Sequence, residues 1–335
     1  MPKVSVIVPN YNHALYLEQR IQSILNQTYQ DFELIYLDDA STDHSNEVFS
    51  QFLNNSRIRA IYNETNSGSP FKQWNKGIKQ ANGEYIWIAE SDDAADPRFL
   101  ETLVTLLDTH PAAGVAYCQS RQIDSTNQLK GTMHWWTDDL SPIRWRQDFY
   151  NSGKEECQNY LLIKNTIPNA SAALTRTHLF EQIGYANESM FLCGDWHTWV
   201  QLLLQTDIAF TAEELNYYRI HTQSVRAKAD RSMLYLKERM QILSFLNERL
   251  ELPEEAVEIV KNKLIRDWLI LIFAIRKCLN FKEDTSFYQL FKTIDPLVEP
   301  RLVKQFNNLF SKKLVRHAKE WVQHSTNYIT GLNNS

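Results

Sequence analysis

The sequence predicts an α/β protein: a mostly parallel central sheet with helices on both of its faces, followed by a helical C-terminal region. Two observations support this fold class. From Lys3 to Gln119, short apolar runs alternate with amphipathic segments, which is the pattern of strand–helix pairs in a parallel sheet. After Val225, long helical segments with charged residues between the apolar positions replace this alternation. We therefore place a domain boundary near Ser224, with residues 1–224 as the α/β domain and residues 225–335 as the helical region.

Two periodicities define the elements of the alternating part. Runs rich in valine, isoleucine and aromatic residues predict strands buried on both faces, and apolar residues three and four positions apart predict amphipathic helices. Polar residues, Pro and Gly separate these elements. The expected strands are Lys3–Val8, Phe32–Leu37, Ile58–Tyr62, Tyr85–Ala89 and Gly114–Gln119; the expected helices are Ala14–Asn26 and three segments that carry Val48, Phe49 and Phe52, then Phe71, Trp74 and Ile78, then Phe99, Leu103, Leu106 and Leu107.

The pattern is looser between Ser120 and Ser224. Gly131–Tyr150 is rich in tryptophan and weakly periodic, so we expect a long loop there. The elements predicted after this loop are helices at Lys154–Lys164, at Thr177–Ile183 and after Cys193, and strands at Ala170–Thr175, Ile208–Thr211 and Leu215–Arg219.

The C-terminal region is expected to form helices at Arg226–Leu250, Glu254–Leu279 and beyond Pro300. Leu264–Cys278 is apolar enough to pack on a partner helix or to touch a membrane surface, and burial within its own domain is the interpretation we favour. The longest apolar run, Trp268–Ile275, is too short to span a membrane, which takes about 20 residues. The apolar N-terminal run is short and has no cleavage pattern, so we expect no signal peptide.

Composition narrows the classes of protein. The chain has 335 residues, of which 43% are hydrophobic and 22% charged, as in ordinary globular domains. Its 35 basic and 40 acidic residues give a net charge of −5, which lacks the basic footprint of a nucleic-acid-binding protein. The four cysteines are scattered without a C-x-x-C pair, which argues against a thiolate zinc site and fits a reducing compartment.

The stretch Tyr85–Asp93, Y-I-W-I-A-E-S-D-D, is the most informative part of the chain. In it, a buried strand runs directly into Glu90, Asp92 and Asp93. Three carboxylates this close repel one another unless a cation lies among them, and Mg²⁺ and Mn²⁺ prefer carboxylate oxygens. The stretch therefore predicts a metal–diphosphate site. The alternative is a polar turn before the helix that Asp96-Pro97 opens.

Three of the expected strands end in polar residues, at Pro9–Asn12, at Asp38-Asp39 and at Glu90–Asp93. Because ligands of open parallel sheets bind beyond the carboxyl ends of the strands, we expect these three ends to form one site. The sequence has no G-x-G-x-x-G after the first strand and no G-x-x-x-x-G-K-[ST]. It therefore lacks the phosphate-binding motifs of dinucleotide-binding and P-loop proteins.

Taken in order, these motifs resemble the inverting family 2 glycosyltransferases of the GT-A fold. The resemblance lies in V-S-V-I-V-P-N-Y-N at Val4–Asn12, D-D-A-S-T-D at Asp38–Asp43, G-E-Y-I-W leading into S-D-D within Gly83–Asp93, Gly194-Asp195, and His221. It covers about the first two-thirds of the chain and leaves the helical region outside. It implies a Rossmann-like, mostly parallel sheet that binds a nucleotide-diphosphate sugar.

The resemblance also implies roles for four residues in nucleotide binding. Pro9, Tyr11 and Asn12 lie along the nucleoside in such proteins, with Tyr11 packing on the base. Asp39 would accept a hydrogen bond from the imide N–H of uracil, which makes a UDP-sugar the expected donor. An aspartate that merely stands at a helix entrance would look the same in sequence.

The resemblance assigns a metal ion, Mn²⁺ or Mg²⁺, to the acidic stretch. Asp93 is the expected direct ligand, Asp92 lies nearer the ribose or a metal-bound water, and Glu90 supports them. His221 matches the late histidine that meets the metal or the diphosphate in this family, although a lone histidine is more often structural.

Asp195 matches the family's catalytic base, which takes the proton of the acceptor hydroxyl as that oxygen attacks the anomeric carbon. The metal would stabilise the departing diphosphate as a Lewis acid, and a single displacement inverts the anomeric centre. The alternative role for Asp195 is a helix N-cap. The two roles are compatible, because a helix N-terminus favours the carboxylate form.

The chain departs from the family at one phosphate-binding position. Many members carry Ala-Arg-Asn before the glycine that matches Gly77, where this sequence has Gln73-Trp74-Asn75. The arginine can help to hold phosphates, and Lys72 is the candidate to replace it.

The identity of the transferred sugar and of the acceptor is expected to depend on Ser120–Ile167 and on side chains that face the second half of the cleft, where family patterns are weak. Within it, Trp135, Trp136 and Trp145 either stack on the apolar face of a sugar or pin their loop to the core. We favour the second interpretation.

The expected activity is metal-dependent transfer of a hexosyl or N-acetylhexosaminyl group from a UDP-sugar to a saccharide or lipid-linked saccharide acceptor. Two other functions fit parts of the pattern. A sugar nucleotidyltransferase shares the sheet and the acidic metal site but needs a Gly-rich, basic phosphate loop, which Pro9–Asn12 lacks. A non-catalytic nucleotide-binding member would keep the pocket, and the retained Asp39, Asp93 and Asp195 argue against it. We expect a cytoplasmic enzyme of surface polysaccharide or glycan synthesis, with peripheral membrane contact through its C-terminal helices.

Overall fold

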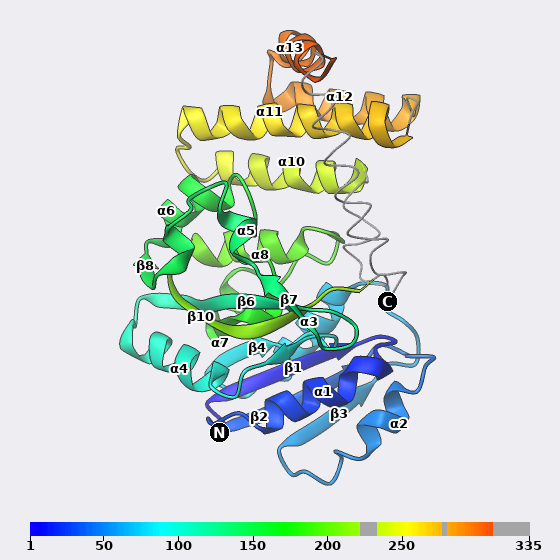
Figure 1. Cartoon of the computed structure of the whole chain (residues 1–335), viewed down its shortest axis with the longest axis vertical. Helices are drawn as coiled ribbons and strands as arrows, with labels where there is room; N and C mark the ends of the chain where they lie inside the picture. Colours follow the sequence, from blue (N-terminus) through cyan, green and yellow to red (C-terminus); the bar gives the residue numbers. More distant parts are fainter. Residues whose placement is uncertain (222–232, 277–279, 311–335) are drawn as a thin grey trace. The chain divides into compact units, whose positions relative to one another are not determined.

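The computed structural model describes residues 1–221, 233–276 and 280–310. The chain divides into two compact units, residues 1–220 and residues 221–335. The boundary expected near Ser224 lies outside the described residues. The first unit contains the sheet, and the described part of the second is helical (Figure 1).

A parallel arrangement of four strands forms the N-terminal half of the sheet, in the order β3-β2-β1-β4. Beyond β4 the order continues β9-β6-β10-β5, with β9 antiparallel to both of its neighbours and β10 parallel to β6. The expected α/β class, with a mostly parallel central sheet, is confirmed. The strands are β1 (Val4–Asn10), β2 (Phe32–Asp38), β3 (Ile58–Tyr62), β4 (Tyr85–Ile88), β5 (Ala94–Ala95), β6 (Ala113–Ile123), β9 (Ala173–Arg176) and β10 (Asp207–Arg219), and β7 (Leu129–Thr132) and β8 (Phe149–Asn151) pair with β6 and β10.

Helices cover both faces of this sheet because alternate residues of each strand point to opposite sides. On one face, Val6 of β1 belongs to the same buried cluster as Leu17 and Ile21 of α1 (Ala14–Leu25). On the other face, Ile7 meets α3 (Pro70–Ile78), where a Cβ at Gly77 would lie 2.4 Å from Ile7 Cγ2. The lack of a side chain at Gly77 therefore lets α3 approach the sheet closely.

The remaining helices of the first unit mostly agree with the periodicity of the sequence. One predicted break is wrong: Ile208–Thr211 and Leu215–Arg219 are parts of one strand, β10, whose pairing with β6 shifts register on both sides of Glu214. A bulge adds residues to one strand without ending it, so the loss of alternation there looks like a turn in sequence. The helices are α2 (Ser45–Ser50), α4 (Phe99–Thr109), α5 (His134–Thr137), α6 (Gly153–Glu156), which continues as a π-helical segment at Cys157–Leu161, α7 (Thr177–Gln182) and α8 (Gly194–Leu203).

The described part of the second unit consists of helices packed on one another. Trp268 of α11 stacks edge-on with Phe287 of α12 and donates from its indole N–H to Asp284 Oδ1 at 2.8 Å. The apolar face of α11 is thus used for packing within this unit. The helices are α10 (Met233–Asn247), α11 (Glu254–Ile270) with a π-helical extension at Leu271–Arg276, α12 (Phe281–Ile294) and α13 (Val298–Phe310).

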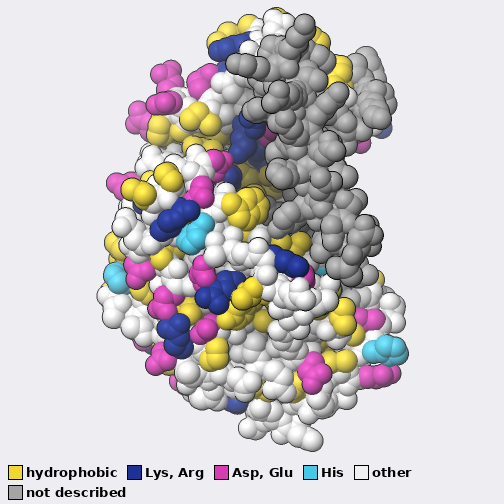
Figure 2. All heavy atoms as spheres, viewed as in Figure 1, with side chains coloured by type: hydrophobic (Ala, Val, Ile, Leu, Met, Phe, Trp, Pro, Cys, Tyr) yellow, Lys and Arg dark blue, Asp and Glu magenta, His cyan; other side chains and the backbone are white. Residues whose placement is uncertain are grey.

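Two further findings concern the surface and the helices. Basic and acidic side chains are intermixed on the face shown in Figure 2, in keeping with the net charge of −5. Within residues 1–221, 233–276 and 280–310, no helix is both long and apolar enough to cross a membrane.

Gly83 precedes β4 at a close crossing with β1, where its own N–H donates to Ser5 Oγ at 2.8 Å. A Cβ at Gly83 would lie 2.5 Å from Ser5 N and 2.7 Å from the carbonyl carbon of Val4, and backbone atoms of a buried strand cannot move aside. We expect Gly83→Ala to lower the free energy of unfolding by about 1–3 kcal/mol in urea denaturation. The control is Gly184→Ala, where φ is +73° and no heavy atom lies within 4 Å of a Cβ, so only backbone strain is added. A smaller loss for Gly83→Ala than for the control would contradict the overlap.

Candidate functional site

The carboxyl ends of β1 and β2 lie side by side, with Asn10 opposite Asp38 in the parallel register. Asn10 Nδ2 donates to Asp38 Oδ1 at 3.1 Å, and Asp39 N donates to Asn10 O at 2.9 Å. Because β4 is the other parallel neighbour of β1, all three polar strand ends meet at this edge. The sheet therefore gathers the predicted motifs in the way the parallel topology requires.

The loop after β1 is fixed to the loop after β2 by one amide side chain. Asn12 has φ +58°, and its Oδ1 accepts from Thr42 N at 2.7 Å and from Asp43 N at 3.3 Å. Pro9 is buried within β1, whereas the Tyr11 side chain is 45% exposed. Of the three residues expected along the nucleoside, Tyr11 thus presents a ring to the outside, and Asn12 holds the loop.

Asp39 is buried among donors from the segment between β3 and α3. Its Oδ1 accepts from Asn63 Nδ2 at 2.6 Å, from Ser67 N at 2.9 Å and from Gln73 Nε2 at 2.9 Å. Its Oδ2 accepts from Ser67 Oγ at 2.8 Å. These four donors fix the carboxylate in one orientation. Asn63, Ser67 and Gln73 were not predicted as site residues. For Asn63 and Ser67, the polar loop that follows β3 could have indicated such a role, as it did after β1 and β2.

The segment that departs from the family pattern has other partners. Lys72 is exposed, and its Nζ donates to Ser67 O at 3.1 Å, on the Asp39 side of the site. Trp74 stands where many members of the resembling family have arginine, and its Nε1 donates to Glu90 Oε1 at 2.8 Å. This position therefore carries a hydrogen bond to the acidic stretch in place of a positive charge.

Glu90 is the first carboxylate after β4. Burial, together with the charge of Asp92 close by, raises its pKa to about 8. Its backbone N–H donates to Ser171 Oγ at 3.0 Å, which holds the start of the acidic stretch against the segment before β9.

Asp93 points into the protein. Its Oδ1 accepts from Arg219 N at 2.9 Å, and its Oδ2 accepts from Ser171 Oγ at 2.7 Å and from Asn169 Nδ2 at 2.9 Å. Burial and the charge of Asp92 raise the pKa of Asp93 in spite of these donors. Both oxygens of the expected metal ligand are thus engaged by protein groups.

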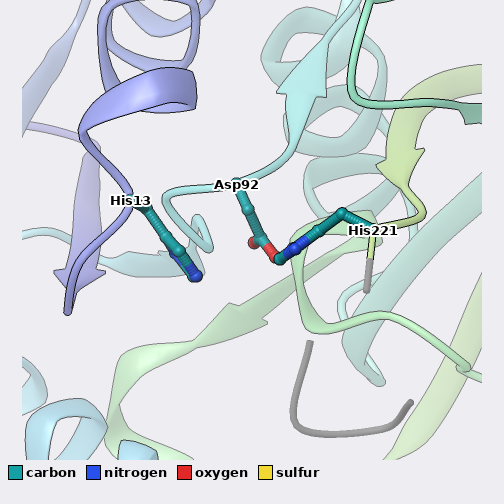
Figure 3. Close-up of side chains that lie close together, drawn as sticks. All are labelled: His13, Asp92 and His221. Carbon is teal, nitrogen blue, oxygen red and sulfur yellow. The ribbon is translucent and has the colours of Figure 1, made fainter. Parts of the chain in front are cut away.

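Asp92 lies with two histidines instead (Figure 3). An imidazole nitrogen of His13, a carboxylate oxygen of Asp92 and an imidazole nitrogen of His221 all lie within 4.8 Å of one another. These residues follow β1, β4 and β10, respectively. The structure therefore brings together Asp92 and His221 from the prediction, adds His13, and leaves Asp93 outside this group. His13, three residues beyond β1, was not predicted.

The geometry of His13 suits a metal ligand. Its Nδ1 lies 2.8 Å from Ser91 Oγ, and Ser91 is the neighbour of Asp92 in the chain. Metal-binding histidines commonly hold the ring in place with a hydrogen bond at one nitrogen and bind the ion with the other. One carboxylate and two imidazoles form a donor set that divalent transition metals favour.

Arg219, the last residue of β10, connects the acidic stretch with helix α1 and with the loop after β6. Its Nε donates to Asp92 O at 2.6 Å, one terminal nitrogen to Asp124 O at 2.7 Å, and the other to Gln19 Oε1 at 2.6 Å. Together with the bond from Arg219 N to Asp93, these contacts fix the backbone around Asp92. No pattern in the sequence predicted this role of Arg219, which lies two residues before His221.

Asp195 lies in the first turn of α8, half-buried. Its Oδ2 accepts from Asn165 Nδ2 at 3.1 Å, and its Oδ1 accepts from Trp196 N at 2.7 Å. The N-cap position belongs to Cys193, which makes no side-chain capping bond, so Asp195 is not the N-cap. At Gly194 a Cβ would lie 2.3 Å from the Phe71 ring, so this end of α8 packs directly on α3.

The tryptophan-rich loop reaches the same aspartate through Asn165. Trp136 Nε1 donates to Asn165 O at 2.7 Å, and the buried Trp145 donates to the Tyr117 hydroxyl at 2.8 Å. These two residues pin the loop, as favoured from the sequence. Trp135 differs, because 55% of its side chain is exposed.

Comparisons with known proteins agree with this arrangement. The sequence model of the family described as "Glycosyl transferase family 2" matches residues 5–184. Glycosyltransferase GlyG of Streptococcus pneumoniae serotype 4 is 30% identical over 238 residues, which cover 66% of this chain and 72% of that protein. The matched range includes Tyr85–Asp93, Asp38–Asp43 and all of the first motif except Val4, and it ends before Gly194-Asp195 and His221.

Two solved structures show the same fold. S. aureus TarS 1–349 in complex with UDP-GlcNAc has a TM-score of 0.66 at 18% identity, covering 98% of this chain and 92% of that one. The mannosyltransferase PcManGT from Pyrobaculum calidifontis, in complex with GDP-Man and Mn²⁺, has a TM-score of 0.58 at 16% identity, covering 93% and 88%. At these identities the likeness concerns the fold, and the expected GT-A fold is confirmed.

Because the pKa of Glu90 is raised in the folded protein, we expect the free energy of unfolding in metal-free buffer to depend on pH. The folded carboxyl keeps its proton up to a pH of about 8, whereas the unfolded carboxyl loses it near the model value of 4.5. The folded state therefore binds more protons between these values, and the wild-type protein loses stability as the pH rises through them. Glu90→Gln removes this loss and keeps an oxygen for Trp74, so its free energy of unfolding should rise relative to wild type from about pH 5 to about pH 8.

Urea denaturation at several pH values measures this difference, with Glu64→Gln at an exposed position as the control. A Glu90→Gln difference that stays constant with pH would contradict the burial explanation.

Proposed function

Because the chain belongs to glycosyl transferase family 2, we propose that it transfers a sugar from a nucleotide diphosphate, UDP in the first instance, to a hydroxyl acceptor with inversion at the anomeric carbon. Family membership makes it a glycosyltransferase; the donor, the inversion and the metal dependence are the content of the proposal.

The observation that carries the proposal is that one turn of α3 contacts three separate parts of the site. A nucleobase pocket, an acidic metal loop and a general base have to be held at fixed distances for such a transfer. The contacts are Gln73 to Asp39, Trp74 to Glu90, and Phe71 against Gly194 beside Asp195.

Asp39 is proposed to select the base. An ionised carboxylate only accepts hydrogen bonds, and the imide N–H of uracil is a donor. The four protein donors leave Asp39 ordered before the nucleotide arrives, which lowers the cost of binding. Tyr11 supplies an exposed ring to pack on the base, and Pro9 and Asn12 shape the loop beneath it. The neighbour solved with UDP-GlcNAc supports this choice, and the neighbour solved with GDP-Man makes GDP the competitor to test.

A divalent metal is proposed at His13, Asp92 and His221, and the nitrogen and oxygen donors there fit Mn²⁺ better than Mg²⁺. When bound, the metal neutralises the diphosphate and acts as a Lewis acid on the leaving group. This replaces Asp93 as the direct ligand, because the Asp93 oxygens accept from Arg219, Asn169 and Ser171. Lys72 remains a proposed diphosphate contact, since it is exposed at the end of α3 nearest the site.

Asp195 is proposed as the general base. The acceptor O–H gives its proton to an Asp195 oxygen while the acceptor oxygen forms a bond to the anomeric carbon and the bond from that carbon to the diphosphate breaks. Hydrogen bonds from Asn165 and from Trp196 N fix the orientation of its carboxyl group.

The transferred group is proposed to be a hexose or an N-acetylhexosamine, and the acceptor a saccharide or lipid-linked saccharide of a surface polysaccharide or glycan. Reaction in the cytoplasm and peripheral membrane contact of the C-terminal helices belong to the same proposal. Cell fractionation tests both.

Calorimetric titration with UDP, GDP and dTDP, each with Mn²⁺ and with a chelator, tests donor and metal together. We expect UDP to bind most tightly and only with Mn²⁺, and we expect Asp92→Asn to lose at least about tenfold of that affinity, because a carboxylate ligand is removed. Asp93→Asn is the matched neighbour and should retain more of it. Preference for GDP would contradict the role of Asp39. Absence of metal-dependent binding to all three would contradict the proposed function and favour a non-catalytic member.

Asp195→Asn should lower the rate of sugar transfer by about 10²–10⁴-fold, the usual contribution of a general base, while UDP affinity stays the same because the amide has the same shape. Release of UDP from a panel of UDP-sugars with a cell-envelope acceptor fraction provides the assay. Asn165→Ala, which removes the donor that orients Asp195, should cause a smaller loss. A variant Asp195→Asn with full transfer activity would show that another group is the base.

A further inference from the structure

Arg20 is a buried charge that the proposed chemistry does not use. It lies on the inner face of α1, its side chain is 0% exposed, and its guanidinium carbon stands 4.8 Å from the centre of the Trp87 ring in β4. Trp87 is three residues before Glu90, so Arg20 lies under the strand that leads into the acidic stretch.

None of the three guanidinium nitrogens of Arg20 has a hydrogen-bond partner among the residues that the structure describes. A buried charge without hydrogen bonds is strongly destabilising unless other charges compensate it. The Trp87 ring supplies part of that compensation through a buried cation–π contact.

The larger compensation comes from the acidic stretch. Burial lowers the pKa of Arg20 to about 10, and the negative charges of Asp93, Asp92 and Glu90 act in the opposite direction. The side chain therefore stays charged at neutral pH. At neutral pH the Glu90 carboxyl is protonated, so Arg20 interacts with the charges of Asp92 and Asp93, through space and without a bond to either of them.

Arg219 provides the contrast. It fixes the same stretch with directed bonds to Asp92 O and, from its backbone N–H, to Asp93. Removing Arg219 would change the geometry of the loop, whereas removing the charge of Arg20 with a side chain of similar volume would change mainly the local electrostatic potential.

We propose that Arg20 is the permanent counter-charge of the acidic stretch: it stabilises Glu90–Asp93 when no cation is bound, and it limits the affinity of the site for a cation. Arg20 thus acts on the proposed metal site indirectly, through the electrostatic effect of its charge on the acidic stretch. The inference rests on the proposed function only in taking this stretch as the place where a divalent metal binds.

The test compares wild type, Arg20→Met and Arg20→Lys in two measurements. The first is the Kd of Mn²⁺ in the presence of saturating UDP, obtained from the electron paramagnetic resonance signal of free Mn²⁺. The second is the melting temperature in chelator and in Mn²⁺ with UDP. Arg20→Met keeps the length and apolar stem of the side chain but loses the charge, and Arg20→Lys keeps the charge.

We expect Arg20→Met to bind Mn²⁺ about tenfold more tightly, because one positive charge no longer opposes the cation at an effective dielectric constant of about 20. In chelator it should melt at a lower temperature than wild type, and most of this difference should disappear with Mn²⁺ and UDP. Arg20→Lys should resemble wild type in both measurements. Arg20→Gln, also neutral, serves if Arg20→Met does not fold.

An unchanged or weaker Kd for Mn²⁺ in the neutral variants, or a melting difference that is the same with and without Mn²⁺, would overturn the inference and leave Arg20 as a packing residue on Trp87. Failure of the proposed function is seen separately, because wild type itself would then show no Mn²⁺-dependent binding of UDP.

Discussion

The site depends on the position of α3 against the sheet. Because Gly77 has no side chain, the helix lies close to Ile7 of β1, and its N-terminal turn is held at the sheet edge where the strands end. From there a single turn contacts Asp39, the acidic stretch and the start of α8. Two of these contacts are hydrogen bonds from buried side chains, Gln73 to Asp39 and Trp74 to Glu90, so a shift of the helix would alter both together.

The acidic stretch separates two neighbouring aspartates by burial. Ser91 and Asp92 form a turn after β4, in which Asp93 N donates to Glu90 O at 3.2 Å. Around this turn Asp93 points into the protein, whereas Asp92 lies beside the two histidines. The inward carboxylate is tolerated because Asn169, Ser171 and Arg219 donate to it. The same donors order the backbone on both sides of Asp92, so a buried polar network fixes this residue next to the two histidines.

The sequence predicted the parts of the site that lie next to strand ends. Asp39 and Asp92 stand in motifs that follow strand ends, and the parallel topology brings these ends together; Asp195 lies in the first turn of α8 and was singled out by the family resemblance alone. The resemblance named Asp93 as the metal ligand, whereas the structure groups Asp92 with the two histidines. This difference depends on how the turn at Glu90–Asp93 packs against Asn169 and Ser171, which the sequence does not reveal. It also could not supply Asn169, whose contact with Asp93 depends on the antiparallel insertion of β9 between β4 and β6. Such partners lie on distant segments and carry no periodic signal.

The negative charge of Glu90–Asp93 explains why the unpredicted residues around it, such as Arg20, Arg219 and Asn169, are basic or carry neutral hydrogen-bond donors. Burial, and after it the charge of Asp92, raises the pKa values of Glu90 and Asp93, so part of the repulsion within the stretch remains in the fold. Directed bonds from Arg219 fix the geometry of the stretch, and the charge of Arg20 offsets its potential without fixing any atom. Under the proposed metal role, the directed bonds order the stretch before a cation arrives, and the charge of Arg20 limits how strongly the stretch attracts one.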